Sequence, residues 1–519
     1  MQRPPAEIVL HPARLTALAI LALVCGSLLG LAGAGSGAAT PAPLGPYLQH
    51  IAASAAVQAG LSTLLSLPVG TALALALLRR RFPGRDLLLA LLASAAVAPT
   101  IVIAFGIVAI YGRSGLLGTL SGSLGLQAPS IYGLHGIVLA HLVMNAPLVA
   151  RALLHAFERE PGERLRLAAA LGFSAVDCFR HLDWPLIRRE APALAVLVFL
   201  LCFTSFAIVL ALGGGPANAT LEVAIYEAVR FEADFTRAAA LAALQLALCL
   251  GLAAGLAALT PPIRDEAAAD RQASRPDAGA LRGPDGFVLL LSIALIAPPL
   301  LSVASGLAAL PLLASAEVAR AAATSAVIAA GAGLAACLLA LLLASAARSS
   351  PRGTRLPDLA AFAMLGLPPF AFVAGLYALL RGLADPALLG LGLVPLVNAL
   401  MALPFAYRLL WPVLATGAAR YGRLADSLGL QGWNRLVLVE WPALRGALGA
   451  AFAFAAALSL GDFGVVALFG GGDLTTLPYL LANRLGAYRT DEAGALALLL
   501  VLSAGCLAWL AQRWSRRHA

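Results

Sequence analysis

"RLRLAAALGFSAVDCFRHLDWPLIRRE" (residues 164–190) is a segment rich in charged residues in a chain of which only 12% of the residues are charged. A relative of this segment returns as "YGRLADSLGLQGWNRLVLVEWPALRG" at residues 421–446. In each segment the proline of a Trp-Pro pair stands thirteen residues after a glycine, Gly172 or Gly429. The fold has to explain why one chain contains two copies of the same polar insert.

The composition of the rest of the chain is that of a membrane protein. Of its 519 residues, 61% are hydrophobic and 12% are charged, and the mean hydropathy is +0.89. Apolar stretches of ~20 residues recur, and each is long enough to cross about 30 Å of hydrocarbon as a helix. Because a backbone in lipid must satisfy its own hydrogen bonds, these stretches predict an all-α polytopic membrane protein.

The sequence predicts twelve transmembrane helices. They lie within residues 15–33, 52–78, 87–110, 133–154, 191–212, 238–259, 286–308, 320–346, 357–380, 388–411, 447–468 and 492–511. With the amino terminus inside, 28 of the 35 arginines fall on the cytoplasmic side, which predicts that both termini lie in the cytoplasm. This bias also accounts for the net charge of +9, so we expect no nucleic-acid partner. The first apolar run ends in small residues that suit a signal peptidase, but it is long enough to span, and we expect an uncleaved helix.

The chain contains an internal duplication. An offset of 257 residues maps Pro442 onto Pro185 and carries "DFGVVALFGGG" (462–472) onto "SFAIVLALGGG" (205–215). Repeated matches at one offset indicate two homologous halves. The predicted organisation is two six-helix halves joined by a flexible cytoplasmic linker. In chain order, the first half, the linker and the second half are residues 1–260, 261–285 and 286–519.

Each polar segment predicts a docking element on the cytoplasmic side, between the fourth and fifth spans of its half. A short helix should end at the glycine, which adopts a left-handed backbone at low cost. A second short helix follows, with an apolar stripe at Phe173, Val176 and Phe179 in the first copy, and the Trp-Pro pair should break it. An amphipathic helix resting on lipid headgroups is the alternative. Two copies with one glycine-to-proline spacing favour protein docking.

The two segments resemble the EAA loop of type I ABC importer permeases, in which a coupling helix seats in a groove of a cytoplasmic ATPase. Longer stretches are similar to the thiamine (thiamine pyrophosphate) ABC transporter permeases, which are fused double permeases. These stretches are "RRRFPGR" (79–85), "GERLRLAAALG" (162–172), "LCFTSFAIVLALGGGPANATLEVAIYEA" (201–228) and "LSLGDFGVVALFGGGDLTTLPYLL" (458–481). The resemblance covers nearly the whole chain apart from the linker.

The resemblance implies a type I ABC importer fold with coupling loops at about 157–190 and 414–446. The residues that it assigns to ATPase coupling are Ala168, Gly172, Phe179, Pro185, Ala425, Gly429, Trp433 and Pro442. One departure is that Arg166 and Arg423 stand where the family loop has its acidic residue. The resemblance also implies a separate ABC ATPase in two copies, a periplasmic substrate-binding protein and a place in the bacterial inner membrane.

The residues of the chain predict a transport subunit and not an enzyme. The chain contains no lysine, so it cannot form a Walker loop that binds nucleotide phosphates. It shows no Ser/His/Asp set and no HExxH motif, and its six cysteines have no metal or disulfide spacing. We therefore expect no catalytic, cofactor or metal site in this chain. ATP and magnesium should bind to the partner ATPase.

Ionisable and amide groups inside the spans are candidates for the translocation pathway, because they are costly in lipid. Asp462 is the first candidate, and the other half holds the neutral Ser205 at the matching position. For a cationic cargo such as thiamine, this carboxylate beside Phe463 and Phe206 offers electrostatic and cation–π attraction. The alternative is that Asp462 pairs with an arginine or caps a helix. Three further candidates lie on the fourth spans: His141, Asn145 and Asn398.

The predicted function is the permease subunit of an ATP-driven importer that passes thiamine or its phosphates from a binding protein to the cytoplasm. The same class of permease with ferric iron or a polyamine as cargo is an alternative. A twelve-helix secondary transporter is a second alternative. That class keeps its long polar loop in the middle of the chain, whereas here the long loops lie within each half. Pro99, Pro368 and Pro369 should kink the third span of their halves.

Overall fold

The computed structural model describes most of the chain. The described residues are 12–35, 44–126, 130–259, 275–345, 355–364, 367–380, 382, 386–430, 432–469 and 474–516. All regular elements in these ranges are helices, so the predicted all-α fold is confirmed. The helices of the first half are α1 (Pro12–Gly35), α2 (Leu44–Arg79), α3 (Arg85–Val97), α4 (Thr100–Tyr111), α5 (Leu116–Ser123), α6 (Leu134–Glu158), α7 (Gly162–Ala170), α8 (Ala175–Cys178), the π-helical η1 (Phe179–Asp183), α9 (Trp184–Phe203), α10 (Ala207–Leu212), η2 (Pro216–Asn218), α11 (Leu221–Arg230) and α12 (Phe235–Leu259).

The second half follows a similar order, but a single helix, α17 (Pro386–Ser427), spans the positions that α6 and α7 occupy in the first half. The second half comes after a short 3₁₀ turn, η3 (Pro276–Gly279). Its helices are α13 (Arg282–Leu301), η4 (Ser302–Leu307), η5 (Leu310–Leu313), α14 (Ala316–Ala344), α15 (Arg355–Ala363), α16 (Pro369–Leu380), α17 (Pro386–Ser427), α18 (Gly432–Arg435), the π-helical η8 (Leu436–Glu440), α19 (Trp441–Leu460), α20 (Gly464–Phe469), α21 (Leu477–Gly486) and α22 (Thr490–Arg516).

Among the described residues, ten helices are long and apolar enough to cross a membrane. The two other predicted spans are present as helices that miss this criterion. One is α9, which carries Arg188, Arg189 and Glu190 in its first two turns. The other is divided into α15 and α16, and α16 has only 12 residues. The chain is therefore a multi-pass membrane protein with the spans close to where the sequence predicts them.

Proline divides the third span in each half. α3 ends at Val97 and α4 begins at Thr100, with Pro99 at the N-cap of α4. In the second half Pro368 precedes α16, which begins at Pro369. The predicted kinks are confirmed, and the first of them is a complete break. Proline lacks the N–H that a continuous helix needs and crowds the preceding turn.

The first helix of each half packs on the other half. α1 lies against α14, α15 and α16, and α13 lies against α2, α3 and α4. The backbones touch at both crossings. A Cβ added to Gly375 in α16 would lie 2.0 Å from the carbonyl oxygen of Ser27 in α1. A Cβ added to Gly106 in α4 would lie 2.2 Å from the carbonyl oxygen of Pro299 in α13. Small residues at such crossings let helices in lipid approach closely.

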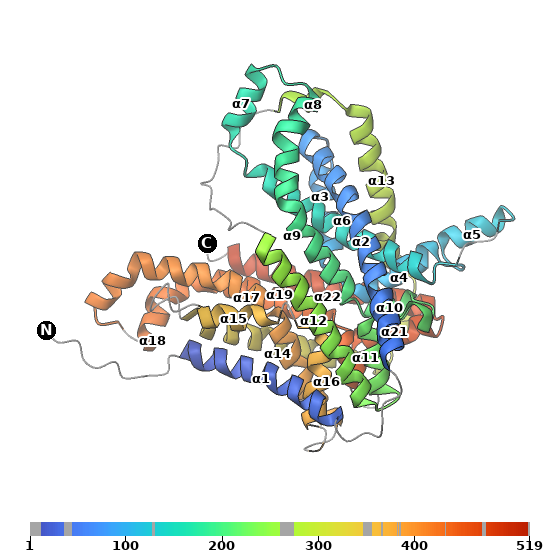
Figure 1. Ribbon diagram of the computed structural model, residues 1–519, viewed down its shortest axis with the longest axis vertical. Helices are drawn as coiled ribbons and strands as arrows, with labels where there is room; N and C mark the ends of the chain where they lie inside the picture. The colour runs from blue at the N-terminus through green and yellow to red at the C-terminus, as the bar shows by residue number, and fades with distance from the viewer. Residues whose placement is uncertain are drawn as a thin grey trace.

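The two halves form two arms that diverge from a common junction (Figure 1). One arm contains α2, α3, α6 and α9, and it ends at α7 and α8. The other contains α14, α15, α17 and α19, and it ends at the tip of α17 and at α18. At the junction α11 contacts α16 and α20, and α4 contacts α21 and α22. The polar segments that open the sequence analysis therefore lie at the two far ends of the molecule.

The crossing glycines give a test of this packing. Gly375→Ala places a methyl group where the Ser27 carbonyl oxygen lies, so α1 and α16 must separate. We expect the variant to lose roughly 1–3 kcal/mol of stability, the usual cost of overpacking. The measurement is the thermal transition of the detergent-purified protein. Gly60→Ala is the matched control, because no atom lies within 4 Å of its added Cβ. Equal transitions for the two variants would contradict the close crossing.

Candidate functional site

The helix that opens each polar segment ends next to its glycine, as the sequence predicts, but only the first of them is the predicted short helix (α7), because the second is the end of the 42-residue α17. Gly172 has φ +67° and Gly429 has φ +66°, the left-handed conformation. The amide of Phe173 donates to the Ala168 carbonyl at 3.0 Å, and the amide of Leu430 donates to the Ala425 carbonyl at 2.9 Å. This six-to-one bond defines a Schellman motif. Both alanines are 2% exposed, so the two loops share one geometry at equivalent positions.

The Trp-Pro pair does not break the second short helix, and this part of the prediction is wrong. The chain continues from α8 through η1 into α9, and from α18 through η8 into α19. The Trp184 amide donates to the Phe179 carbonyl, five residues back, and Trp441 repeats this with Leu436. The π turn adds one residue to the helical turn, which leaves room for the ring of Pro185 or Pro442 that follows.

Apolar side chains are exposed at matching positions of the two loops. Leu171 is 63% exposed and its equivalent Leu428 is 65% exposed. Phe179 and Trp184 are also exposed, with ring centroids 6.2 Å apart. The predicted coupling residue Trp433 belongs to α18, but its side chain lies outside the described part of the chain. The arm ends thus present apolar groups to their surroundings in two copies.

The helix of the first loop begins at a capping box. The Ser174 hydroxyl accepts from the Asp177 amide at 3.3 Å, and the Asp177 carboxylate accepts from the Ser174 amide at 3.1 Å. The hydrogen bond from the Ser174 hydroxyl is the main reason why the pKa of Asp177 is lowered. The reciprocal bonds fix the first turn of this helix.

Arg275, at the end of the linker, holds the first loop. It donates to both oxygens of Asp183 at 2.9 Å and to those of Asp277 at 2.8 and 3.0 Å. Burial lowers the pKa of the Arg275 guanidinium, but its hydrogen bonds to these two carboxylates outweigh burial and raise the pKa above its ordinary value. Arg79, the last residue of α2, and Arg80, which follows it, bind Asp285 at 2.8 Å each.

The predicted flexible linker therefore ends earlier than residue 285. Residues 261–274 lie outside the described residues, and from Arg275 onward ion pairs attach the chain to the first half. In the second loop Glu440 stands at the position of Asp183, and one of its contacts is with Arg435 of the same loop, at 3.5 Å. Arg435 also pairs with Asp426 at 3.0 Å.

A cavity of about 310 Å³ lies where the two arms meet. Its lining comes from both halves. The residues are Thr100, His141, Met144, Asn145, Leu148, Leu201, Thr204, Ser205, Phe206, Ala207, Ile208, Glu222, Pro369, Phe370, Gly461, Asp462, Phe463, Gly464 and Val465. This volume is at the lower end of the range for small-molecule pockets. The set contains every predicted pathway residue except Asn398, whose amide donates to Ser459 at 2.9 Å and also interacts with the Asp462 carboxylate.

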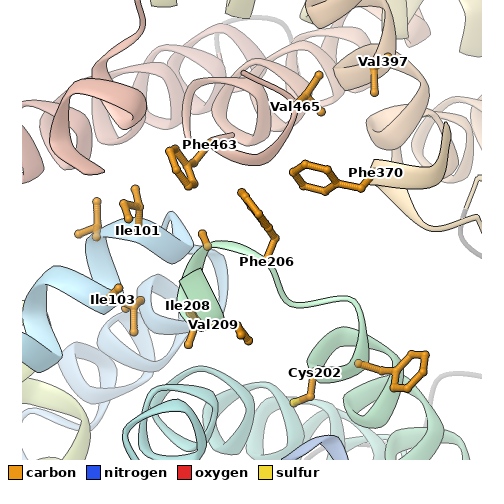
Figure 2. Close-up of a cluster of buried hydrophobic side chains, with 14 of the residues drawn as sticks. Ile101, Ile103, Cys202, Phe206, Ile208, Val209, Phe370, Val397, Phe463 and Val465 are labelled. Atoms are coloured by element: carbon orange, nitrogen blue, oxygen red, sulfur yellow. The ribbon is translucent and has the colours of Figure 1, made fainter. Parts of the chain in front are cut away.

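Aromatic rings form one wall of the cavity. Figure 2 shows Phe206 of the first half reaching between Phe463 and Phe370 of the second half. The ring centroids of Phe206 and Phe463 are 5.5 Å apart and stacked, and those of Phe206 and Phe370 are 4.2 Å apart. Phe463 and Ala207 also line a second cavity of about 530 Å³, between α4, α10 and α21. The two cavities therefore share a wall.

Asp462 caps a helix with one oxygen and leaves the other without a partner. Its Oδ1 accepts from the amides of Gly464 and Val465, at 3.0 and 3.4 Å, at the start of α20. Its Oδ2 is buried without a hydrogen-bond partner. Among the described residues no arginine forms an ion pair with it. The predicted alternative of a helix cap thus applies to Oδ1, while Oδ2 remains free to accept a further bond.

Sequence reasoning missed Glu222, which lies in α11 and lines the same cavity. It lies between the fifth and sixth predicted spans, and the pathway candidates predicted from the sequence are residues within spans. Its side chain is fully buried and accepts a hydrogen bond from Gln245 of α12 at 2.9 Å. The signal that could have identified it is an acidic residue within the repeated "TLEVAI" stretch (220–225). His141 contacts Ser62 at 3.0 Å, and its Nε2 has no partner.

Comparison with known proteins identifies the family. No family model matches the chain. The chain is 43% identical over 512 residues to the thiamine transport system permease protein ThiP of Brucella melitensis, covering 96% of this chain and 94% of the relative. It is 42% identical over 466 residues to ThiP of Escherichia coli, covering 88% and 87%. It is 36% identical to ThiP of Haemophilus influenzae over 471 residues, covering 89% and 88%. The resemblance found in the sequence is confirmed, and the chain belongs to the family of thiamine transport system permease proteins.

Proposed function

We propose that this chain passes thiamine, or its phosphates, across the bacterial inner membrane as the permease subunit of an ATP-driven importer. A periplasmic binding protein delivers the cargo, and a separate ABC ATPase supplies the energy. Both termini and both loops lie in the cytoplasm. The observation that carries the proposal is the family membership over 96% of the chain. The two equivalent loops at the arm ends support the same assignment.

The two loops are the docking sites for two copies of the ATPase. They have the same Schellman motif, the same π turn and apolar side chains exposed at matching positions. A symmetric pair of ATPase subunits needs two such matching surfaces. The exposed leucines and aromatic rings are the kind of group that gains free energy on being covered by a partner.

Movement of the loops changes access to the cavity at the junction. Each loop continues without a break into a long helix, α9 or α19, and these helices end at Thr204 and Gly461 in the cavity lining. An ATPase pair that closes on nucleotide draws the loops together, and the rigid helices carry this movement to the cavity. Phe463, at the wall that the two cavities share, and Phe206, which stacks on it, are the groups whose separation opens the outer side.

The function is tested with the complex of permease, ATPase and binding protein in proteoliposomes. The ligands are thiamine, thiamine phosphates, ferric iron and a polyamine, and the readouts are ATP hydrolysis and uptake. Thiamine or a phosphate of it should stimulate hydrolysis and accumulate inside. Stimulation by iron or the polyamine alone would replace the cargo assignment. Uptake that needs an ion gradient and no ATP would identify a secondary transporter.

Docking is tested at the glycine that ends the first helix. Gly172→Val forces a β-branched residue into a left-handed backbone, at a cost of about 1–2 kcal/mol, although no atom lies within 4 Å of the added Cβ. Gly172→Asn is the matched control, because asparagine tolerates this backbone. We expect the valine variant to reach the membrane in normal amount but to recover less ATPase in a pull-down. Equal recovery for both variants would overturn the docking assignment.

A further inference from the structure

Glu222 is a buried carboxylate with an unused oxygen at the wall of the cavity. Its side chain is 0% exposed, and it lies in α11, close to α16 and α20 of the other half. Oε1 accepts from Gln245, and the backbone of Phe370 also interacts with the carboxylate, while Oε2 makes no hydrogen bond of normal geometry. A buried acceptor without a partner is costly, and in native proteins such an atom is usually explained by a ligand or by function.

Three buried polar atoms of the cavity lining have no hydrogen-bond partner, namely one oxygen each of Asp462 and Glu222 and the Nε2 of His141. Asp462 Oδ2 and Glu222 Oε2 are both buried, both unpartnered, and both belong to residues of the lining. The lining residues that the structure describes include no arginine to neutralise them. Aromatic rings of Phe206, Phe463 and Phe370 stand beside these groups. Unpaired carboxylate oxygens next to ring faces form an environment that suits an organic cation.

The two carboxylates come from different halves and from positions that the duplication does not relate. The residue equivalent to Asp462 is Ser205. Aligning "TLEVAI" (220–225) with "TLPYLL" (476–481) places Pro478 opposite Glu222. The cavity is thus chemically unsymmetric within a duplicated fold. This arrangement suits one cargo molecule with two different polar ends.

We propose that Glu222 is a cargo-binding residue of this permease, and that with Asp462 it holds a flat organic cation against the aromatic wall. Gln245 positions the carboxylate through Oε1, so that Oε2 accepts from the cargo. The inference rests on the proposed function, and it adds to that function a cation-selective site within the membrane. Thiamine has the required chemistry, with a cationic thiazolium ring and an amino-substituted second ring.

The test measures binding to the permease–ATPase complex in detergent, without the binding protein. The probes are radiolabelled thiamine and its uncharged oxidation product thiochrome. Glu222→Gln should weaken thiamine binding by roughly ten- to hundred-fold, the range for loss of a hydrogen bond to a charged group. Thiochrome binding should change little. Asp462→Asn should give the same pattern. Glu227→Gln, on the same helix but outside the cavity lining, should bind both probes like the wild type.

A second variant covers the case in which Glu222→Gln does not assemble. The exchange Glu222→Gln with Gln245→Glu keeps one acid and one amide in contact but moves the acid away from the lining. It should assemble normally and still lose thiamine binding. Normal thiamine binding by either variant would overturn the proposal and leave Glu222 as a structural partner of Gln245. The proposal would also be overturned if the wild-type complex transports thiamine in the presence of the binding protein but binds no thiamine in its absence. A wild-type complex that does not transport thiamine would instead refute the proposed function.

Discussion

The structure depends on the two crossings at which the first helix of each half touches the third span of the other half. At both crossings a glycine allows a backbone carbonyl oxygen to approach where any side chain would clash, at Gly375 against Ser27 and at Gly106 against Pro299. The arms diverge from the junction, so they offer each other little surface farther out (Figure 1). Because α1 packs on the second half and α13 packs on the first, these two helices join the halves at the junction. The far ends of the halves remain separate.

The two halves have matching backbone features in their loops, but the side chains around the loops and in the cavity differ between the halves. The loops at the arm ends have the same backbone, with matching glycines, π turns and exposed leucines. The side chains around them are not the same, because Asp183 of the first loop binds the linker residue Arg275, and Glu440 at the matching position contacts Arg435 of its own loop. The cavity shows the same contrast, with one carboxylate from each half at unrelated positions. The proposed function accounts for both features, because a paired ATPase needs two matching loops and a single cargo molecule does not need a symmetric cavity.

The spans and the helix ends of the two loops could be predicted from the sequence. Lipid requires long apolar helices, and a left-handed backbone at a helix end favours glycine. Hydrophobic length gives the spans, and the repeated Gly172 and Gly429 give the helix ends that the structure shows. The Trp-Pro pair was read as a break because local propensity does not reveal that a π turn can admit the proline ring. Glu222 escaped because it lies in a short helix outside the spans that returns to the cavity. The ion pair between Arg275 and Asp183 joins residues that are 92 positions apart in the sequence. A local sequence pattern cannot predict such a contact.

The central claim is that the two arms are rigid levers that move toward each other when the ATPase binds nucleotide. It is tested by attaching spin labels at Leu87 of α3 and Leu359 of α15, exposed residues on opposite arms, in a variant without the six native cysteines. The distance between the labels is then measured by pulsed electron resonance in the complex with the ATPase. The account predicts a shorter distance in the nucleotide-trapped complex than in the nucleotide-free complex. The same distance distribution in both states, in a complex that hydrolyses ATP and transports cargo, would contradict it.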